Sequence, residues 1–282
     1  MSKRMTRRQF LRGCLGIAAG AVVTPTCGLL YVSRIEPDWL QVERVAVALP
    51  DLPPPLAGFT IAHLSDLHLG PTVSIADARH AVNIANALQP DLVALTGDFV
   101  YRSAEYAQAC AQELASLEAT QGVVACLGNH DLWEDAPLIR RELTNVGISV
   151  LVNAGLSLAG GELWVAGVDD VWSGDPDLDA ALNGAPADAT IILLAHEPDY
   201  ADVVSEHGGV DLQLSGHSHG GQVQLPLIGA PVLPYLGRRY PAGLYHIEEL
   251  TLYTNRGVGT IYPPIRFNCR PEVTLITLTE KS

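Results

Sequence analysis

Short apolar runs alternate along this chain with longer amphipathic stretches. In the first half, the runs predict buried strands at residues 40–49, 59–65, 92–96, 123–127 and 148–152. The stretches between them predict helices at about residues 74–88, 103–117 and 136–146. Ser74, followed three residues later by Asp77, predicts a capping box at the start of the first helix. Strands that alternate with helices favour right-handed crossovers and parallel pairing.

The second half of the chain is richer in strands than in helices. Its apolar runs predict strands at residues 163–168, 191–194, 212–215, 222–225, 252–254 and 273–278. Two mixed sheets packed face to face, with helices outside, would accommodate all of these elements. We therefore predict an α/β protein with one main domain at residues 59–282, preceded by a linker and first strand at residues 36–58.

The N-terminus combines a basic segment with a long uncharged run. The segment Thr6-Arg7-Arg8-Gln9-Phe10-Leu11-Arg12 resembles a twin-arginine export signal. Residues 13–33 carry no charge, and this run is long enough to span a bilayer at roughly 20 residues. Residues 1–35 therefore predict an exported protein, periplasmic or on the outer face of the cytoplasmic membrane, with the twin-arginine machinery as a partner. A retained membrane anchor is favoured over a cleaved signal; a hydrophobic core helix is the alternative.

Charge is distributed unevenly between this leader and the rest of the chain. The formal net charge is −14, from 17 basic and 31 acidic residues. Five of the basic residues lie within residues 1–12, which contain no acidic residue, so the remainder has 12 basic residues against 31 acidic ones, a net charge of −19. Such a body repels polyanions, so we expect no nucleic-acid polymer as a partner. A small anionic substrate is still compatible with this negative charge if bound cations make the binding site locally positive.

Five short polar motifs each follow directly after a predicted strand. They are Asp66-Leu67-His68, Gly97-Asp98, Gly128-Asn129-His130-Asp131, His196 and Gly216-His217-Ser218-His219-Gly220. Ligand sites in α/β sheets lie beyond the carboxyl ends of the strands, so the motifs should converge on one rim. Oxygen and imidazole ligands without a thiolate suit divalent ions such as Mn, Fe or Zn. A neighbouring pair of ions is suited to displacement at phosphorus. The alternative is a set of satisfied polar groups at strand ends and turns.

The order and residue types of these motifs resemble the calcineurin-like metallophosphoesterase family, over about residues 59–222. The resemblance implies a four-layer αββα sandwich, a metal-dependent hydrolase of phosphoesters and two divalent ions. It also implies the role of each residue. Asp66, His68 and His219 match ligands of the first metal, Asp98 the bridging ligand, Asn129, His196 and His217 ligands of the second metal, and His130 the catalytic histidine beside the phosphate.

One position departs from the family pattern. Many relatives carry a second acid three residues after the bridging aspartate, where it pairs with the catalytic histidine; here this position is Tyr101. Asp131 neighbours His130 in sequence, but adjacency does not establish contact. The partner that orients His130 therefore stays open.

Some polar residues near the motifs are predicted to lie outside the site. His63 stands within an apolar strand and is predicted to be a packed core histidine. Asp169 and Asp170 could add ligands, but a solvated turn is favoured.

A long loop at residues 225–244 follows the last predicted ligands and is rich in Pro, Gly and apolar residues. Such a loop would overhang the metals and could offer an apolar wall to a lipid or nucleoside. Arg238, Arg239 and Arg256 are candidates for contact with a substrate phosphate. The alternative is a packed surface loop with a solvated arginine pair.

The leader, the residues Gly216 to Gln222 and the segment Ile265-Arg266-Phe267-Asn268 resemble a membrane-associated branch of the family. That branch includes phosphodiesterases and enzymes that hydrolyse UDP-2,3-diacylglucosamine. The resemblance implies hydrolysis of a phosphodiester or pyrophosphate bond in a small anionic substrate, with a lipid-linked or nucleotide substrate as options. The alternatives are a broad phosphomonoesterase and a catalytically idle, metal-dependent binding protein of the cell envelope.

Overall fold

Two six-stranded sheets form the centre of the computed structural model, which describes Arg8 and residues 25–281. The first sheet has the order β1 (Gln41–Leu49), β12 (Glu272–Glu280), β2 (Thr60–Leu64), β3 (Leu92–Thr96), β4 (Val123–Cys126) and β5 (Ser149–Val150). The second has the order β10 (Gly243–Ile247), β11 (Leu250–Thr254), β9 (Leu212–Ser215), β8 (Thr190–Leu194), β7 (Leu163–Gly167) and β6 (Ala154–Leu158). Both sheets are mixed, because antiparallel pairs stand beside parallel ones.

Apolar side chains fill the space between the sheets and beneath the helices. In β3, Leu92 and Ala94 pack into the core shared with the second sheet, while Val93 and Leu95 pack into the core shared with the helices. This division follows from the two-residue period of a strand. Because both faces of β3 are covered, its first four residues are all apolar.

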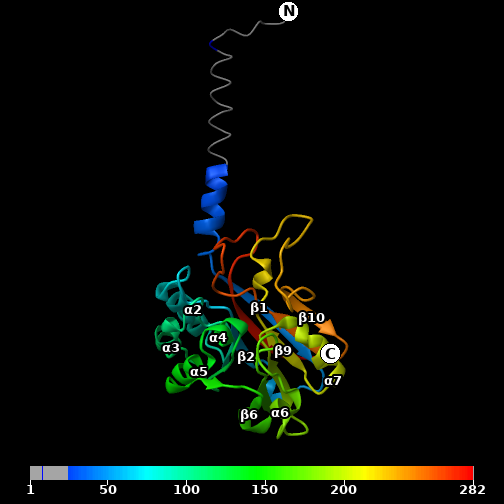
Figure 1. Cartoon of the computed structure of the whole chain (residues 1–282). Helices are drawn as coiled ribbons and strands as arrows, with labels where there is room; N and C mark the ends of the chain where they lie inside the picture. Colours follow the sequence, from blue (N-terminus) through cyan, green and yellow to red (C-terminus); the bar gives the residue numbers. More distant parts are fainter. Residues whose placement is uncertain (1–7, 9–24, 282) are drawn as a thin grey trace, which may run out of the picture.

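Helices cover the outer faces of both sheets (Figure 1). The first sheet is covered by α2 (Ile75–Ala87), α3 (Ala107–Leu114) and α5 (Ala136–Asn145). The second is covered by α6 (Leu178–Leu182) and α7 (Ala201–His207). The predicted four-layer αββα sandwich is thus confirmed. The predicted capping box is also present: Ser74 Oγ accepts from the backbone N–H of Asp77, and the Asp77 carboxylate accepts from that of Ser74.

Parallel pairing brings five strand ends to one rim. Strands β2, β3, β4 and β5 run parallel in the first sheet, as do β7, β8, β9 and β11 in the second. Asp66, Asp98, Asn129, His196 and His217 follow two or three residues after the ends of β2, β3, β4, β8 and β9. The short helix α4 (Asn129–Glu134) begins at this rim.

One predicted strand is wrong. Residues 222–225 form only isolated bridges, Val223 with Phe267 and Leu225 with Gly229. The backbone turns at Gln222, whose φ is +57°, and again between Leu225 and Gly229. The segment therefore cannot stay extended. Several short elements were not predicted: β6, β10, α4, α6 and α7.

The chain enters the domain through a helix. Residues 25–30 are helical, and a π-helical turn follows at Tyr31–Ile35. The backbone N–H of Arg266 donates to the carbonyl of Val32 at 2.8 Å, which ties this helix to the domain. Across Arg8 and residues 25–281, no helix is both long enough and apolar enough to traverse a bilayer. Apart from Arg8, residues 1–24 of the predicted leader lie outside the described residues.

Candidate metal centre

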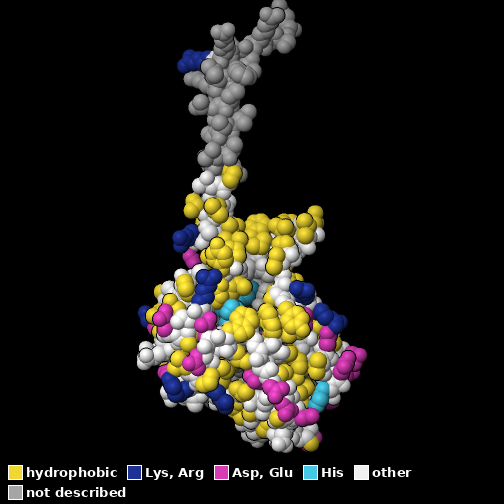
Figure 2. Space-filling view, viewed as in Figure 1, with side chains coloured by type: hydrophobic (Ala, Val, Ile, Leu, Met, Phe, Trp, Pro, Cys, Tyr) yellow, Lys and Arg dark blue, Asp and Glu magenta, His cyan; other side chains and the backbone are white. Residues whose placement is uncertain are grey.

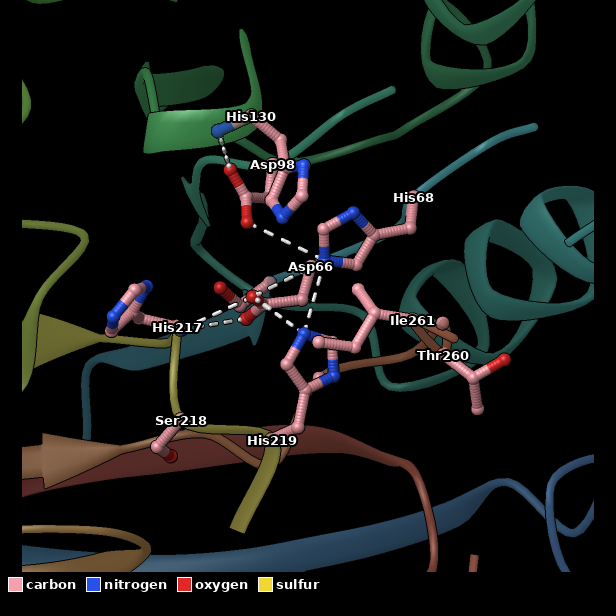
Figure 3. A network of polar contacts seen from close by, with 12 residues as sticks. Asp66, His68, Asp98, His130, His217, Ser218, His219, Thr260 and Ile261 are labelled. Carbon is pink, nitrogen blue, oxygen red and sulfur yellow. Dashed lines mark hydrogen bonds and ion pairs between the residues drawn. The ribbon is translucent and has the colours of Figure 1, made fainter. Parts of the chain in front are cut away.

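The loops after the five strand ends carry the seven predicted metal ligands, and Figure 3 shows Asp66, His68, Asp98, His217 and His219 close together. Each of the seven is 5% exposed or less. Five of them adopt a left-handed backbone conformation, with φ between +49° and +68°: Asp66, His68, Asp98, His217 and His219. Such positions cost energy for residues other than glycine and collect at functional sites.

Two motif glycines have a steric reason to be there. A Cβ at Gly128 would collide with the Asp98 carboxylate, and one at Gly216 would collide with Ser65 and the Asp66 carboxylate. Any side chain at these positions would push the candidate ligands apart. The glycines therefore serve close packing of the cluster.

The first group of candidate ligands consists of Asp66, His68 and His219. His219 Nε2 lies 3.0 Å from His68 Nε2 and 3.2 Å from Asp66 Oδ1, and His68 Nε2 lies 3.8 Å from the same oxygen. Ligand atoms bound at about 2.1 Å to one ion lie roughly 3–3.5 Å from each other. The three atoms are therefore spaced as ligands around a single ion would be.

Asp98 links this group to a second one. Its Oδ2 lies 3.4 Å from His68 Nε2 and 3.2 Å from His196 Nε2, so it stands where a bridging ligand would stand. The Oδ1 atom of Asn129, close to the same rim, is buried and has no hydrogen-bond partner among the described residues. A buried amide oxygen without a partner costs free energy, which a bound cation would offset.

Backbone carbonyls fix the tautomers of two histidines. His196 Nδ1 lies 2.6 Å from the carbonyl of Thr96, and His217 Nε2 lies 2.7 Å from that of Tyr235. Since a carbonyl only accepts, each of these nitrogens carries the proton. The lone pairs of His196 Nε2 and His217 Nδ1 are left for a metal, an arrangement typical of metal-binding histidines.

The electrostatics of the cluster also favour cations. Burial lowers the pKa of His68 to about 3 and that of His217 to about 4, which leaves both rings neutral, the form that binds metals. Against the effect of burial, Asp98 and Asp66 raise the pKa of His196 well above its ordinary value. The two carboxylates thus place negative charge at the cluster, which a bound cation would balance.

Asp131 supports the cluster from behind, a role that the sequence did not reveal. Its Oδ2 accepts from the backbone N–H groups of Asp98 at 2.8 Å and Gly128 at 3.0 Å, and its Oδ1 accepts from Phe99 at 2.9 Å. The carboxylate therefore joins the loops after β3 and β4. Across the described residues the hydrogen bonds of this carboxylate come from backbone groups and not from the His130 ring, so Asp131 does not orient that ring.

His130 is held by other means. Its backbone N–H donates to Asp98 Oδ1 at 2.9 Å, and its half-buried ring stands edge-on to His68, Tyr101 and Trp133, with ring centroids 4.7–5.3 Å apart. Tyr101 therefore packs against His130 in place of the acid that many relatives carry. The Tyr101 hydroxyl accepts from the backbone of Tyr262 at 3.3 Å, away from the ring.

The three candidate arginines differ in their partners. Arg256 pairs with Glu43 at 2.6 Å and with Glu272, and Arg239 pairs with Asp202. The backbone N–H groups of Arg238 and Arg239 both donate to the Asp199 carboxylate at 3.0 Å. Contact between these side chains and a phosphate stays a prediction, as do the ligand roles of the seven residues above.

A second acidic pair lies beside the cluster. The prediction of a solvated turn is wrong for Asp170, which is 1% exposed and accepts from the backbone of Ser173 at 2.6 Å. It neighbours Glu197, a fully buried residue that forms a further candidate metal group with His196 and His217. The sequence did not single out Glu197, although its place directly after His196 was a usable signal. His63 is a core histidine as predicted, with Nε2 at 2.8 Å from Thr96 Oγ1.

Known proteins resemble this chain in sequence. The model of the calcineurin-like phosphoesterase family matches residues 59–221. The uncharacterized metallophosphoesterase YkuE of Bacillus subtilis is 35% identical over 98% of both chains. The phosphodiesterase YaeI of Escherichia coli is 34% identical over 97% of this chain and 99% of its own. The UDP-2,3-diacylglucosamine pyrophosphatase LpxG of Chlamydia muridarum is 27% identical over 90% of this chain and 94% of its own.

The family match contains every motif that carries the cluster, from Asp66 to His219. The relatives extend this similarity over nearly the whole chain and include a phosphodiesterase and a pyrophosphatase. With several groups of candidate metal ligands at the strand ends, the chain is a metal-dependent hydrolase and belongs to the calcineurin-like phosphoesterase family.

Proposed function

We propose that this protein hydrolyses phosphodiester or pyrophosphate bonds with a pair of divalent ions. The observation that carries the proposal is the place of Asp98 Oδ2, between His68 Nε2 at 3.4 Å and His196 Nε2 at 3.2 Å. Asp66, His68 and His219 would hold one ion on one side of this carboxylate. Asn129, His196 and His217 would hold the other on the opposite side.

Bound ions of this kind polarise the phosphoryl oxygens and acidify a water molecule. The residues of the chain supply the remaining functions. Asp131 keeps the loops of Asp98 and Asn129 in register, because its carboxylate accepts from four backbone N–H groups in them. The half-buried ring of His130 lies beside His68 and Asp98, where it would protonate a leaving oxygen of a bound phosphoester.

Aromatic side chains beside the cluster favour a substrate with groups on both sides of the phosphate. Trp133 stands edge-on to His130, and Trp172 lies 5.8 Å from the His217 ring, between Trp133 and Tyr235. These three side chains are 40–56% exposed. A phosphodiester or pyrophosphate has a second substituent on the phosphate, which could pack against these aromatic side chains. A phosphomonoester lacks this substituent. The names of YaeI and LpxG point to the same two bond types.

The location and the substrate are further parts of the proposal. The twin-arginine-like segment and the uncharged residues 13–33 support export and attachment at the outer face of the cytoplasmic membrane. The aromatic wall and the similarity to LpxG support a lipid-linked or nucleotide substrate such as UDP-2,3-diacylglucosamine.

A pair of aryl substrates tests the reaction. With Mn²⁺ added, we expect turnover of bis(4-nitrophenyl) phosphate to exceed that of 4-nitrophenyl phosphate, and a chelator to abolish both. Faster hydrolysis of the monoester would support the phosphomonoesterase alternative. A metal-loaded protein that hydrolyses neither aryl ester nor UDP-2,3-diacylglucosamine would instead support the idle binding protein.

A further inference from the structure

An uncharged, apolar loop projects from the end of the domain at which the N-terminal helix leaves (Figures 1 and 2). Residues 223–237 contain no charged side chain, although the chain as a whole carries −14. Leu227 is fully exposed, and Ile228 and Val232 are 75% and 74% exposed. Large apolar side chains gathered on a surface mark an interaction site.

The backbone of this loop is closed on itself. The N–H of Leu225 donates to the carbonyl of Gly229 at 2.9 Å, and the N–H of Gly229 donates back to the carbonyl of Leu225 at 2.8 Å. Between them, Leu227 has a φ of +68°, a conformation that costs free energy for a bulky residue. Its exposed side chain gains no packing within the domain to offset that cost. The turn at residues 225–229 thus pairs part of its own backbone while its apolar side chains are exposed, which lowers the cost of entering a lipid phase.

The loop lies beside the base of the helix. Tyr31 of the helix and Pro226 of the loop line the same cavity of about 380 Å³. Leu29, Leu30 and Ile35 on the helix are 52–64% exposed, so they continue the apolar surface. Residues 25–33, the described part of the uncharged run, belong to this helix, so the helix and the loop lie at the same end of the domain.

Aromatic and basic side chains surround this apolar end. The Arg270 guanidinium lies 3.4 Å from the centroid of the Trp39 ring, and that of Arg102 lies 5.7 Å from the Tyr262 ring. Both rings are exposed, at 48% and 69%. Aromatic rings with basic neighbours are typical of the zone where a membrane protein meets lipid headgroups. On an acidic protein, arginines at this end complement anionic lipid headgroups.

The loop makes direct contact with the candidate ligands. The carbonyl of Tyr235 accepts from His217 Nε2, and Gly221, two residues after His219, packs so closely that a Cβ there would collide with Ala230. Figure 2 shows histidine side chains at the surface near this apolar end. The apolar tip is therefore in direct contact with the rim of the metal centre, through Tyr235 and Gly221.

We propose that the loop at residues 225–236 is a second membrane contact, which enters the outer part of a bilayer beside the N-terminal helix. The loop then holds the rim of the metal centre at the lipid surface, where phosphoesters of membrane amphiphiles are presented. This last step rests on the proposed function; the membrane contact itself does not depend on catalysis.

Fluorescence quenching tests the contact without any turnover. In the full chain, Cys14 and Cys27 are replaced by serine, and Leu227→Cys is introduced and labelled with an environment-sensitive dye. The labelled protein is reconstituted into vesicles of phosphatidylethanolamine and phosphatidylglycerol. Cys110, Cys126 and Cys269 are buried and escape labelling. Val203→Cys is the matched control, because Val203 is an apolar residue, 52% exposed, on α7.

We expect the dye at position 227 to emit at shorter wavelength than the dye at 203. Lipids brominated on their acyl chains should quench it strongly, and aqueous iodide should quench it weakly. Position 203 should show the opposite pattern, and Val232→Cys should repeat the result for 227 if the first variant folds poorly. Equal iodide quenching at 227 and 203 would overturn the proposal. So would a blue shift that depends on protein concentration and not on brominated lipid, because that result would indicate contact between copies.

Discussion

Replacing Asp98 with asparagine should remove metal and activity together. Asp98 Oδ2 is the one candidate ligand atom that lies within 3.4 Å of nitrogens from both groups, His68 Nε2 and His196 Nε2. An amide carries no negative charge to attract two cations. We therefore expect occupancy to fall and diester turnover to drop by on the order of 10³-fold, since bound ions contribute several kcal/mol of charge stabilisation.

The measurement pairs elemental analysis with turnover on the same samples. Glu105→Gln is the matched control, because it makes the same isosteric change at an exposed carboxylate. It should keep both metal and activity. An Asp98→Asn variant that retains two ions per chain and full turnover would contradict the bridging role.

Replacing His130 with alanine should separate chemistry from metal binding. The contact between His130 and Asp98 runs through the backbone N–H, which alanine retains. Metal content should therefore stay at the wild-type level. The rate should fall by about 10²–10⁴-fold, the usual contribution of a general acid. The loss should be smaller for a diester with a good leaving group, because such a group needs no proton.

Tyr101→Phe is the matched variant for this test. It keeps the ring edge that packs on His130 and loses only a hydroxyl that faces Tyr262. Its rate should stay close to that of the wild type. If His130→Ala slowed good and poor leaving groups equally, His130 would not be the acid; if it lost metal, His130 would be a ligand.

The strand ends could be predicted from sequence because both signals are local. A run such as Leu92–Leu95 is continuously apolar when both faces of a strand are covered, and the motif Gly97-Asp98 follows directly after Thr96. The rule that sites lie beyond the carboxyl ends of strands then places the motifs on one rim. Neither step needs knowledge of the tertiary contacts.

The supporting contacts could not be predicted, because they join residues far apart in sequence. Asp131 accepts from the backbone of residues 32 and 33 positions earlier, and Arg256 pairs with Glu43, 213 positions away. The sequence near each residue would look the same without these contacts. The false strand at residues 222–225 has a similar origin, since the left-handed backbone of Gln222 leaves no mark on the apolar pattern.

Metal titration of the stripped protein tests the central claim most directly. Activity on bis(4-nitrophenyl) phosphate would be followed as Mn²⁺ is added, with bound metal counted at each step. We predict that turnover is absent in the stripped protein and saturates when two ions are bound per chain. Full activity with one ion per chain, or turnover that persists in the stripped protein, would contradict a two-metal phosphoesterase.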